Sequence, residues 1–167
     1  MELYILRHGV AAERGSGAFR SDSQRPLTPD GIKKLRRMVG AMHALGLTFD
    51  LILSSPYARA RQTADIVARG LGLERALELS ALLEPGADLE ALIAELASRR
   101  KDAERVLLVG HEPMLSALIS LLVSGEADLE ITLKKGGLCK LAIRTMSPGR
   151  CATLEWLLAP KHLAAIR

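Results

Sequence analysis

A histidine stands beside an arginine at the end of a short apolar run near the start of the chain. Residues 3–6 have the composition of a buried strand, and Arg7, His8 and Gly9 follow them directly. A neutral imidazole is a good nucleophile toward phosphorus, and a guanidinium can hold the oxygens of the phosphoryl group under attack. These residues make phosphoryl transfer the first hypothesis for the chemistry of this protein.

Two further polar clusters follow apolar runs later in the chain. The strand-like run 49–53 leads into a helix with Arg59 in its first turn, because apolar residues recur at helical spacing from position 60 onward. A third run, 106–109, is followed by His111 and by another helical pattern. In an open α/β sheet, ligands bind at the carboxyl ends of the strands. We therefore expect His8, Arg59 and His111 to meet at one edge of a sheet.

The remaining histidines and a second arginine have more ordinary interpretations. His43 lies within a helical pattern, where a side chain rarely reaches a strand-end crevice, and His162 receives the same interpretation. Arg61 competes with Arg59 as the arginine of the second cluster. Two residues apart on one helix, their side chains point in different directions, so only one of them is expected to face the site.

Strand-like and helical patterns alternate over the first two thirds of the chain. Thr28 and Pro29 form a helix start, and this helical pattern stops at Gly46. Another helix is predicted to begin at Asp88. Residues 13–24, which are rich in Gly and Ser, are predicted to form a loop that arches over the site and is a candidate for substrate selection.

The last third of the chain changes character. Short strand-like runs cover residues 131–133, 138–143 and 153–158, with turn sequences between them. Together the patterns predict an α/β fold in a single domain over residues 1–167. Its central sheet would be mostly parallel, with helices on both faces and C-terminal hairpin strands that extend the sheet.

Composition and charge argue against several other classes of protein. The chain has 167 residues and a formal net charge of +4, yet no basic run is interleaved with aromatic residues, so nucleic-acid binding is not favoured. No signal sequence is visible and the apolar runs are shorter than the ~20 residues that span a bilayer, so we expect a cytoplasmic protein with no membrane partner. In that compartment Cys139 and Cys151 are expected to be reduced, buried thiols, with a disulfide as the less favoured alternative.

These motifs make the sequence resemble the histidine phosphatase superfamily, and within it the small phosphohistidine phosphatases of the SixA type. The matching segments, in the family's order, are Arg7-His8-Gly9, Arg25-Pro26-Leu27-Thr28 with Gly31, Ser55-Pro56 through Arg59-Ala60 and Gln62-Thr63, and Val109-Gly110-His111-Glu112-Pro113. The resemblance implies that His8 is phosphorylated during turnover. Arg7, Arg59 and His111 would complete the phosphate pocket. The family pattern selects Arg59 and leaves Arg61 on the surface or behind the pocket.

The charges of the expected site fit this chemistry. His8 must be neutral to attack phosphorus, and Arg7 and Arg59 should lower its pKa by disfavouring the imidazolium. The same guanidiniums would stabilise the phosphoryl oxygens in the transition state, and water would then hydrolyse the phosphohistidine. His111 would give those oxygens a hydrogen bond or a positive charge. With two arginines present and no HExxH motif or carboxylate cluster, we expect neither a metal ion nor a cofactor.

The general acid is the least defined part of the expected site. Many members of the superfamily that cleave phosphate esters carry a glutamate between the second and third motifs, and Glu84 stands in that place. SixA-type proteins often lack an equivalent acid. The other interpretation of Glu84 is a loop residue close to the helix that starts at Asp88. Its role matters because an alkoxide leaving group needs a placed acid, whereas the imidazole of phosphohistidine leaves more readily.

Three functions are consistent with these residues. The leading hypothesis is a metal-independent phosphatase that acts on phosphohistidine in a partner protein. The second is a phosphatase or mutase for a small phosphate ester, which is disfavoured because the chain lacks the long insertions that shape sugar-phosphate pockets in larger relatives. The third is a catalytically silent module that binds phosphorylated proteins, and such a module would have no need of the nucleophile His8.

Overall fold

The computed structural model describes residues 1–15, 19–99 and 102–166. Six strands form one sheet, and helices pack against it. The strands are β1 (Glu2–Arg7), β2 (Leu51–Ser54), β3 (Leu77–Leu79), β4 (Arg105–Gly110), β5 (Leu138–Ile143) and β6 (Ala152–Leu158). The helices are α1 (Pro29–Ala44), α2 (Ala58–Leu71), α3 (Leu89–Arg99), α4 (Met114–Ser124) and the short α5 (Pro160–Leu163). Single 3₁₀ turns lie at Asp22–Gln24, Glu74–Ala76 and Ala81–Leu83.

The sheet is mixed, and its parallel strands lie together. The strand order is β3-β2-β4-β1-β5-β6. The first four strands run parallel, whereas β5 pairs antiparallel with β1 and β6 pairs antiparallel with β5. Because β1, β2 and β4 run in the same direction, their carboxyl ends lie at one edge of the sheet. The predicted α/β fold, with a mostly parallel centre and a C-terminal hairpin, is confirmed.

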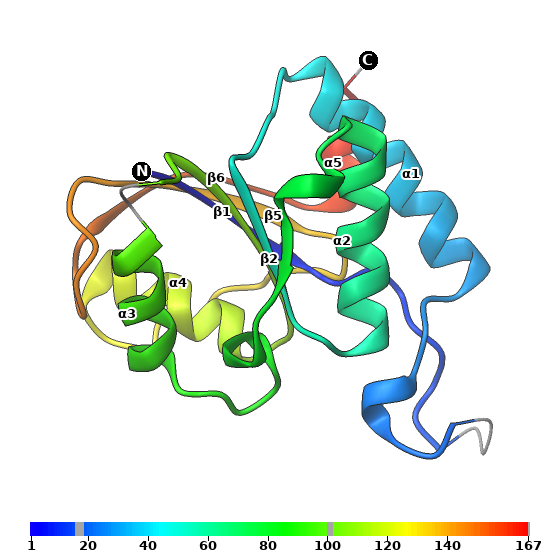
Figure 1. Ribbon diagram of the computed structural model, residues 1–167, viewed down its shortest axis with the longest axis horizontal. Coiled ribbons are helices and arrows are strands. Elements are labelled where there is room, and N and C mark those ends of the chain that lie inside the picture. Colours follow the sequence, from blue (N-terminus) through cyan, green and yellow to red (C-terminus); the bar gives the residue numbers. More distant parts are fainter. Residues whose placement is uncertain (16–18, 100–101, 167) are drawn as a thin grey trace.

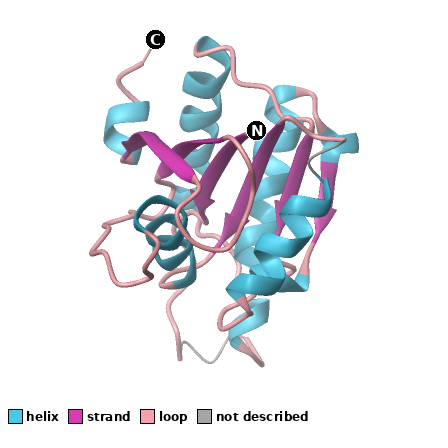
Figure 2. Cartoon of the chain, turned by 90° about the vertical axis from the view of Figure 1, so that its left-hand side faces the viewer, coloured by secondary structure: helices cyan, strands magenta, loops and turns pink. Residues whose placement is uncertain are grey.

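Helices cover both faces of the sheet (Figure 1 and Figure 2). Helices α1, α2 and α5 lie against one face, and α3 and α4 lie against the other. Side chains alternate between the two faces along β1, as the pleat of a strand requires. Leu3 and Ile5 pack with α3 and α4, while Tyr4 and Leu6 pack with α1 and α2. The resulting two apolar layers hold the strand ends in place on both sides.

The helix starts agree with the sequence, and part of the predicted loop can be followed. Thr28 caps α1, because its Oγ1 accepts a hydrogen bond from the Gly31 N–H at 3.0 Å. Helix α3 begins beside Asp88, as predicted. Within the predicted loop 13–24, residues 16–18 lie outside the described residues, and Asp22–Gln24 forms a 3₁₀ turn.

One predicted strand is wrong and one observed strand was not expected. Residues 131–133 do not form a strand. Both edges of β1 are already occupied by β4 and β5, and the Leu133 carbonyl instead accepts a hydrogen bond from Arg7 Nη1 at 2.9 Å. Strand β3 gave no sequence signal because it has only three residues and two of them are exposed.

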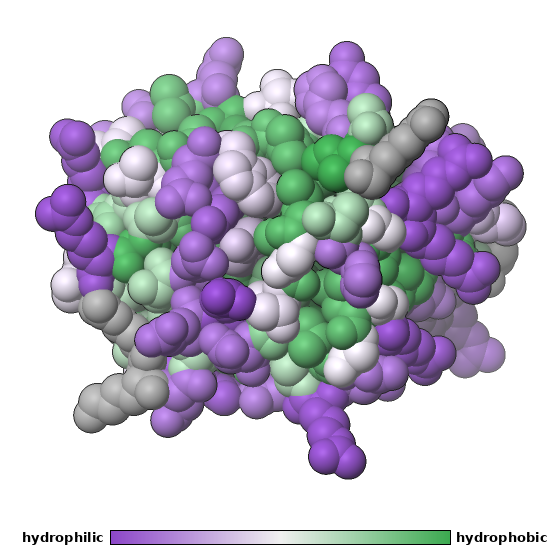
Figure 3. All heavy atoms as spheres, turned by 90° about the horizontal axis from the view of Figure 1, so that it is seen from above, coloured by the Kyte–Doolittle hydropathy of each residue, from purple (hydrophilic) through white to green (hydrophobic). Residues whose placement is uncertain are grey.

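Exposed apolar side chains are scattered and do not form one concentrated patch on the face shown in Figure 3. On the face that Figure 3 presents, apolar areas are interrupted by hydrophilic side chains. The large apolar side chains that are most exposed belong to separate segments, and they are Leu45, Leu79, Leu129 and Leu154.

Both cysteines are free thiols. Cys139 is buried, as expected, whereas Cys151, also expected to be buried, is only half-buried because it precedes the edge strand β6. No helix among the described residues is long and apolar enough to cross a membrane.

Candidate active site

Four polar side chains from three parts of the chain meet at the carboxyl edge of the parallel strands. Arg7 ends β1 and His8 follows it, Arg59 is the second residue of α2, and His111 directly follows β4. All four line one pocket of about 360 Å³. The ring centroids of His8 and His111 lie 5.1 Å apart, and Arg59 Nε lies 3.3 Å from His8 Nε2. The structure therefore brings together the four residues selected from the sequence.

The hydrogen bonds of His8 indicate which ring nitrogen is free to react. His8 Nδ1 lies 2.7 Å from the carbonyl oxygen of Gly9. A carbonyl only accepts hydrogen bonds, so Nδ1 carries the proton and Nε2 carries the lone pair. Arg59 Nε donates to Nε2 at 3.3 Å. A phosphoryl group that approached Nε2 for attack would therefore also come close to the N–H of Arg59 Nε.

Burial keeps His8 neutral. Removal of the ring from water lowers the pKa of His8 to about 4, and the charges of Arg59 and Arg7 add to this effect against the opposing hydrogen bond to Gly9. The direction and the contribution of the two arginines agree with the prediction, which did not include desolvation. Desolvation is the largest contribution, and among the contributions that lower the pKa those of Arg59 and Arg7 follow it. At neutral pH the ring is uncharged, which is the state that attack on phosphorus would require.

Ser55 orients His111. The Ser55 hydroxyl accepts a hydrogen bond from the Tyr57 N–H at 3.3 Å and lies 2.8 Å from His111 Nε2. When this hydroxyl donates to Nε2, the ring proton lies on Nδ1, which is buried and has no partner among the described residues. Burial lowers the pKa of His111 to about 3, with further contributions from the charges of Arg59 and His8. Of the two roles expected for His111, the neutral hydrogen-bond donor fits this geometry.

Two buried nitrogens of residues that line the pocket have no partner, and His111 Nδ1 is a donor when Ser55 donates to Nε2. Arg7 Nη1 donates to the Leu133 carbonyl, but Arg7 Nε is buried and unpaired, as is His111 Nδ1. These are the unpaired buried side-chain nitrogen and oxygen atoms found in the described part of the chain. A buried donor without an acceptor costs roughly 1–3 kcal/mol. A phosphoryl group has the oxygens that would accept from both.

Asp22 belongs to the site and was not singled out from the sequence. Asp22 Oδ2 binds Arg59 Nη2 at 2.8 Å, and the Asp22 carbonyl accepts from Arg59 Nη1 at 2.7 Å. Its other carboxylate oxygen lies 3.1 Å from Arg25 Nε and 3.2 Å from Arg14 Nε. Although desolvation acts to raise it, these arginines hold the pKa of Asp22 below its ordinary value. No local pattern signals this contact, because Asp22 and Arg59 are 37 residues apart.

The other residues of the second motif connect the elements around the pocket. Thr63 Oγ1 accepts from the Gly9 N–H at 3.1 Å and donates to the Arg59 carbonyl at 2.7 Å. Gln62 Oε1 accepts from the Leu27 N–H at 2.8 Å. These bonds fix α2 against the end of β1 and against the segment before α1. They explain why the motif extends beyond Arg59.

Glu84 and Arg61 lie in a neighbouring hollow rather than in the phosphate pocket. This hollow has a volume of about 790 Å³, and both residues line it. Glu84 is half-buried, and the next residue, Pro85, reaches the phosphate pocket in its place. Arg61 is exposed, as expected from its position two residues after Arg59. His43 and His162 are exposed on the surface and away from the site residues.

Two carboxylates line the phosphate pocket itself. Glu112 is engaged with Ser116, accepting from its N–H at 3.2 Å and from its hydroxyl at 2.5 Å. Glu13 lies exposed at the rim. Within residues 1–15, 19–99 and 102–166, no group of three or more His, Cys, Asp or Glu side chains is arranged to hold a metal ion.

Comparisons with known proteins agree with this geometry. The sequence profile of the histidine phosphatase superfamily (branch 1) matches residues 3–85. Phosphohistidine phosphatase SixA of Escherichia coli (strain K12) is 30% identical over 164 residues, which cover 98% of this chain and 96% of that protein. A structure of the protein histidine phosphatase SixA complexed with tungstate has a TM-score of 0.83 at 29% identity, covering 98% of this chain and 99% of that one. The α-ribazole phosphatase from Shigella flexneri shares the fold, with a TM-score of 0.73 at 21% identity over 96% of this chain and 97% of that one.

The similarity to SixA extends over nearly the whole of both chains, in sequence and in fold. It therefore includes the last third, which had contributed little to the sequence motifs. This chain belongs to the histidine phosphatase superfamily (branch 1), and it is a hydrolase of phosphoester or phosphoramidate bonds.

Proposed function

We propose that this protein is a metal-independent phosphatase that dephosphorylates phosphohistidine in a partner protein through a phosphorylated His8. One observation carries the proposal. His8 Nε2, which carries the lone pair of the ring, lies 3.3 Å from Arg59 Nε, and Arg7 and His111, which line the same pocket, each have a buried nitrogen without a partner, Arg7 Nε and His111 Nδ1. A nucleophile and hydrogen-bond donors in one pocket are what phosphoryl transfer requires.

In the first step, His8 Nε2 forms a bond to phosphorus while the bond from phosphorus to the substrate's imidazole nitrogen breaks. The electron pair of that bond leaves with the imidazole, which takes a proton from solvent. Arg59 Nε transfers its hydrogen bond from Nε2 to a phosphoryl oxygen, and Arg7 and His111 donate to the other oxygens. Their donors are already in place, so little reorganisation accompanies the charge shift.

In the second step, water attacks the phosphorus of phosphorylated His8. The phosphorus–nitrogen bond breaks, phosphate leaves, and His8 regains the lone pair on Nε2. The Gly9 carbonyl keeps the proton on Nδ1 throughout, since it accepts from that nitrogen at 2.7 Å. The ring therefore returns to the tautomer in which it started.

Asp22 acts as a positioning residue for Arg59. It engages both Nη groups of the guanidinium, through its carboxylate and through its carbonyl. The remaining donor, Nε, is thereby directed at His8. Asp22 would hold this edge of the arginine toward the phosphoryl group during turnover.

The placement of the acids supports phosphohistidine as the substrate. Glu112 is bound to Ser116, Glu84 lies in the neighbouring hollow and Glu13 is exposed at the rim, so none of the three is a buried, unengaged acid in the pocket. The imidazole of phosphohistidine leaves without the placed acid that an alkoxide needs. The similarity to SixA over nearly the full length supports the same substrate and a protein partner.

A small phosphate ester is the second candidate substrate. Glu84 is half-buried and adjacent to Pro85, which lines the phosphate pocket, so a modest movement of this segment would bring a carboxyl group toward the substrate. In that case the protein would be an ester phosphatase with Glu84 as its acid. The two candidate functions predict opposite effects of a substitution at Glu84.

A substrate panel tests the proposal. Phosphate release is measured from a protein phosphorylated on histidine, from sugar phosphates, from phosphoserine, phosphothreonine and phosphotyrosine peptides, and from an aryl phosphate. We expect the phosphohistidine protein to give the highest kcat/KM. Preference for a sugar phosphate would favour the second candidate, and absence of turnover on every substrate would indicate a binding module. Labelled phosphate trapped on His8 after an acid-free quench would identify the intermediate.

A further inference from the structure

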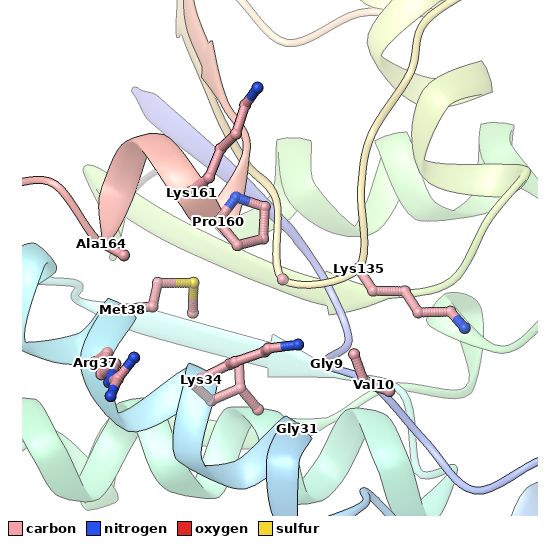
Figure 4. Close-up of a pocket in the computed structure, with 12 residues that line it drawn as sticks. Gly9, Val10, Gly31, Lys34, Arg37, Met38, Lys135, Pro160, Lys161 and Ala164 are labelled. Atoms are coloured by element: carbon pink, nitrogen blue, oxygen red, sulfur yellow. The ribbon is translucent and has the colours of Figure 1, made fainter.

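A second cavity lies beside Gly9, between α1 and α5 (Figure 4). Its volume is about 370 Å³, close to that of the phosphate pocket and within the ~300–1,000 Å³ range of ligand pockets. Its walls are largely apolar. Leu35 and Met38 come from α1, and Pro160 comes from α5. Figure 4 shows Met38 and Pro160 extending into the space between the two helices.

The charged side chains that line this cavity all have the same sign. They come from α1, from the turn 134–137 and from α5, and they are Lys34, Arg37, Lys135 and Lys161. Lys34 extends along the cavity toward Gly9, whereas Lys161 points away from it (Figure 4). Asp30 pairs with Lys34 at 2.7 Å, but it is exposed and does not line the cavity. An apolar interior bordered by cationic side chains is complementary to a molecule that has an apolar body and an anionic group.

The cavity shares a wall with the phosphate pocket. Gly9 lines the cavity, and its carbonyl accepts the hydrogen bond that fixes the His8 ring. Gly136 also lines it, and its N–H bonds to the carbonyls of Arg7 and His8 at 3.0 and 3.1 Å. Lys135 lines both the cavity and the phosphate pocket. A molecule in the cavity would therefore touch the backbone that positions His8.

We propose that this cavity binds a small amphipathic organic anion and that its occupancy is coupled to turnover at His8. The anionic group would lie near Lys34 at the Gly9 end, and an aliphatic or aromatic body would pack against Met38 and Pro160. The binding does not depend on which substrate the enzyme uses. The coupling rests on the proposed role of His8, and activity measured without the anion tests that role separately.

Titration with decanoate tests the binding, with tungstate present to occupy the phosphate pocket. Acetate lacks the apolar body, and decyltrimethylammonium has the same tail with the opposite charge. We expect saturable binding of decanoate, followed by calorimetry, and no binding of the other two probes. Tight binding of decyltrimethylammonium would show that the tail alone is recognised and would overturn the proposal. Strict competition, in which the apparent Kd of decanoate rises in proportion to the tungstate concentration without levelling off, would also overturn it, by assigning the anion to the phosphate pocket.

Two variants locate the site without altering the catalytic residues. Lys34→Glu reverses the charge at the Gly9 end, and Ala164→Trp fills the cavity from the end of α5. Each should weaken decanoate binding by at least about tenfold, which corresponds to ~1.4 kcal/mol. Lys33→Glu is the matched control, because Lys33 is exposed on the same helix and does not line the cavity. Equal weakening by Lys33→Glu and Lys34→Glu would refute the location.

The coupling is read from turnover of an aryl phosphate with and without decanoate. We expect decanoate to change kcat or KM in the wild type and in Lys33→Glu, and to have no effect in Lys34→Glu. Basal turnover without decanoate should be the same in all three proteins. Binding that leaves both kinetic constants of the wild type unchanged would overturn the coupling.

Discussion

The first turns of α2 direct two arginines into two different hollows. Arg59 is 2% exposed, and its guanidinium donates to His8 and Asp22. Arg61 is exposed and lines the larger hollow together with Glu84 and Asp65. A rotation of about 100° per residue on the helix separates two side chains that are close in sequence. The comparison shows that the surroundings, and not the residue type, determine which arginine can act on a phosphoryl group.

The two hollows differ in charge as well as in burial. The phosphate pocket is lined by an excess of cations, among them Arg7, Arg25 and Lys135. The neighbouring hollow places Arg61 with two carboxylates, Asp65 and Glu84. A phosphoryl dianion is attracted to the first arrangement and gains little from the second. Substitutions on each side of α2 can therefore separate catalytic from surface effects.

The largest effect is expected from removal of the nucleophile. His8→Ala should lower kcat on an aryl phosphate to less than about 10⁻⁴ of the wild-type value, because no other neutral imidazole faces the substrate in the same way. The fold should persist, as checked by circular dichroism and thermal unfolding, and His43→Ala on the surface of α1 should leave kcat unchanged. Substantial turnover by His8→Ala would refute the covalent mechanism.

The two arginines of α2 should then differ sharply. Arg59→Ala should lower kcat by about 10²–10³-fold, or ~2.7–4 kcal/mol, the scale of losing one preorganised donor to the transition state. Arg61→Ala should change kcat by less than about threefold, as expected for an exposed charge. Steady-state kinetics of both variants on one substrate give the ratio directly. Comparable losses would mean that the hollow around Arg61 also contacts the substrate.

Asp22→Asn should have an intermediate effect. The amide keeps the shape of the side chain but loses the charge that holds Arg59, so kcat should fall by about tenfold with little change in KM. A fall in kcat without a change in KM is expected if Asp22 positions Arg59. It is not expected if the Asp22 carboxylate competes with the substrate phosphate for Arg59. A lower KM or a higher kcat in Asp22→Asn would show that the carboxylate competes with phosphate for Arg59.

The pH dependence should reflect the buried histidines. With the pKa of His8 lowered from 6.5 to about 4, kcat/KM corrected for ionisation of the substrate should stay level from pH 7 to pH 5 and fall toward pH 4. The unfolded chain binds protons at His8 and His111 below pH 6.5 while the folded chain does not, so the free energy of unfolding should decrease as the pH falls through this window. An inflection of kcat/KM near pH 6.5 would contradict the desolvated state of His8.

The smallest effect is expected from Glu84→Gln. Phosphohistidine hydrolysis should change by less than about twofold, because imidazole departs without a placed acid, while any activity on alkyl phosphates should fall more. The two rates are compared in parallel on the same preparation. Equal, severe losses on all substrates would make Glu84 the general acid and would favour the small-ester alternative.

The sequence by itself determined the elements and the strand ends that carry the motif residues. Buried strands must be apolar and a helix start needs a cap, so the pattern of residues 3–6 and the Thr28 cap were visible without coordinates. The position of Arg59 near the start of α2 followed in the same way. Short β3 and the irregular segment 131–133 were not predicted correctly, because three residues contain too little pattern to distinguish a strand from a loop.

Only the tertiary structure decided how the site residues are oriented and charged. Arg7 donates to the Leu133 carbonyl, 126 residues away along the chain. Arg59 is held by Asp22, at a separation of 37 residues, and His111 is held by Ser55, at a separation of 56 residues. No local spacing encodes such contacts, because they depend on the path of the whole chain. The same holds for the low pKa of His8, whose main cause is burial by residues from several elements. Sequence periodicity reports which side of an element is buried, whereas distances and desolvation arise only when the elements are packed together.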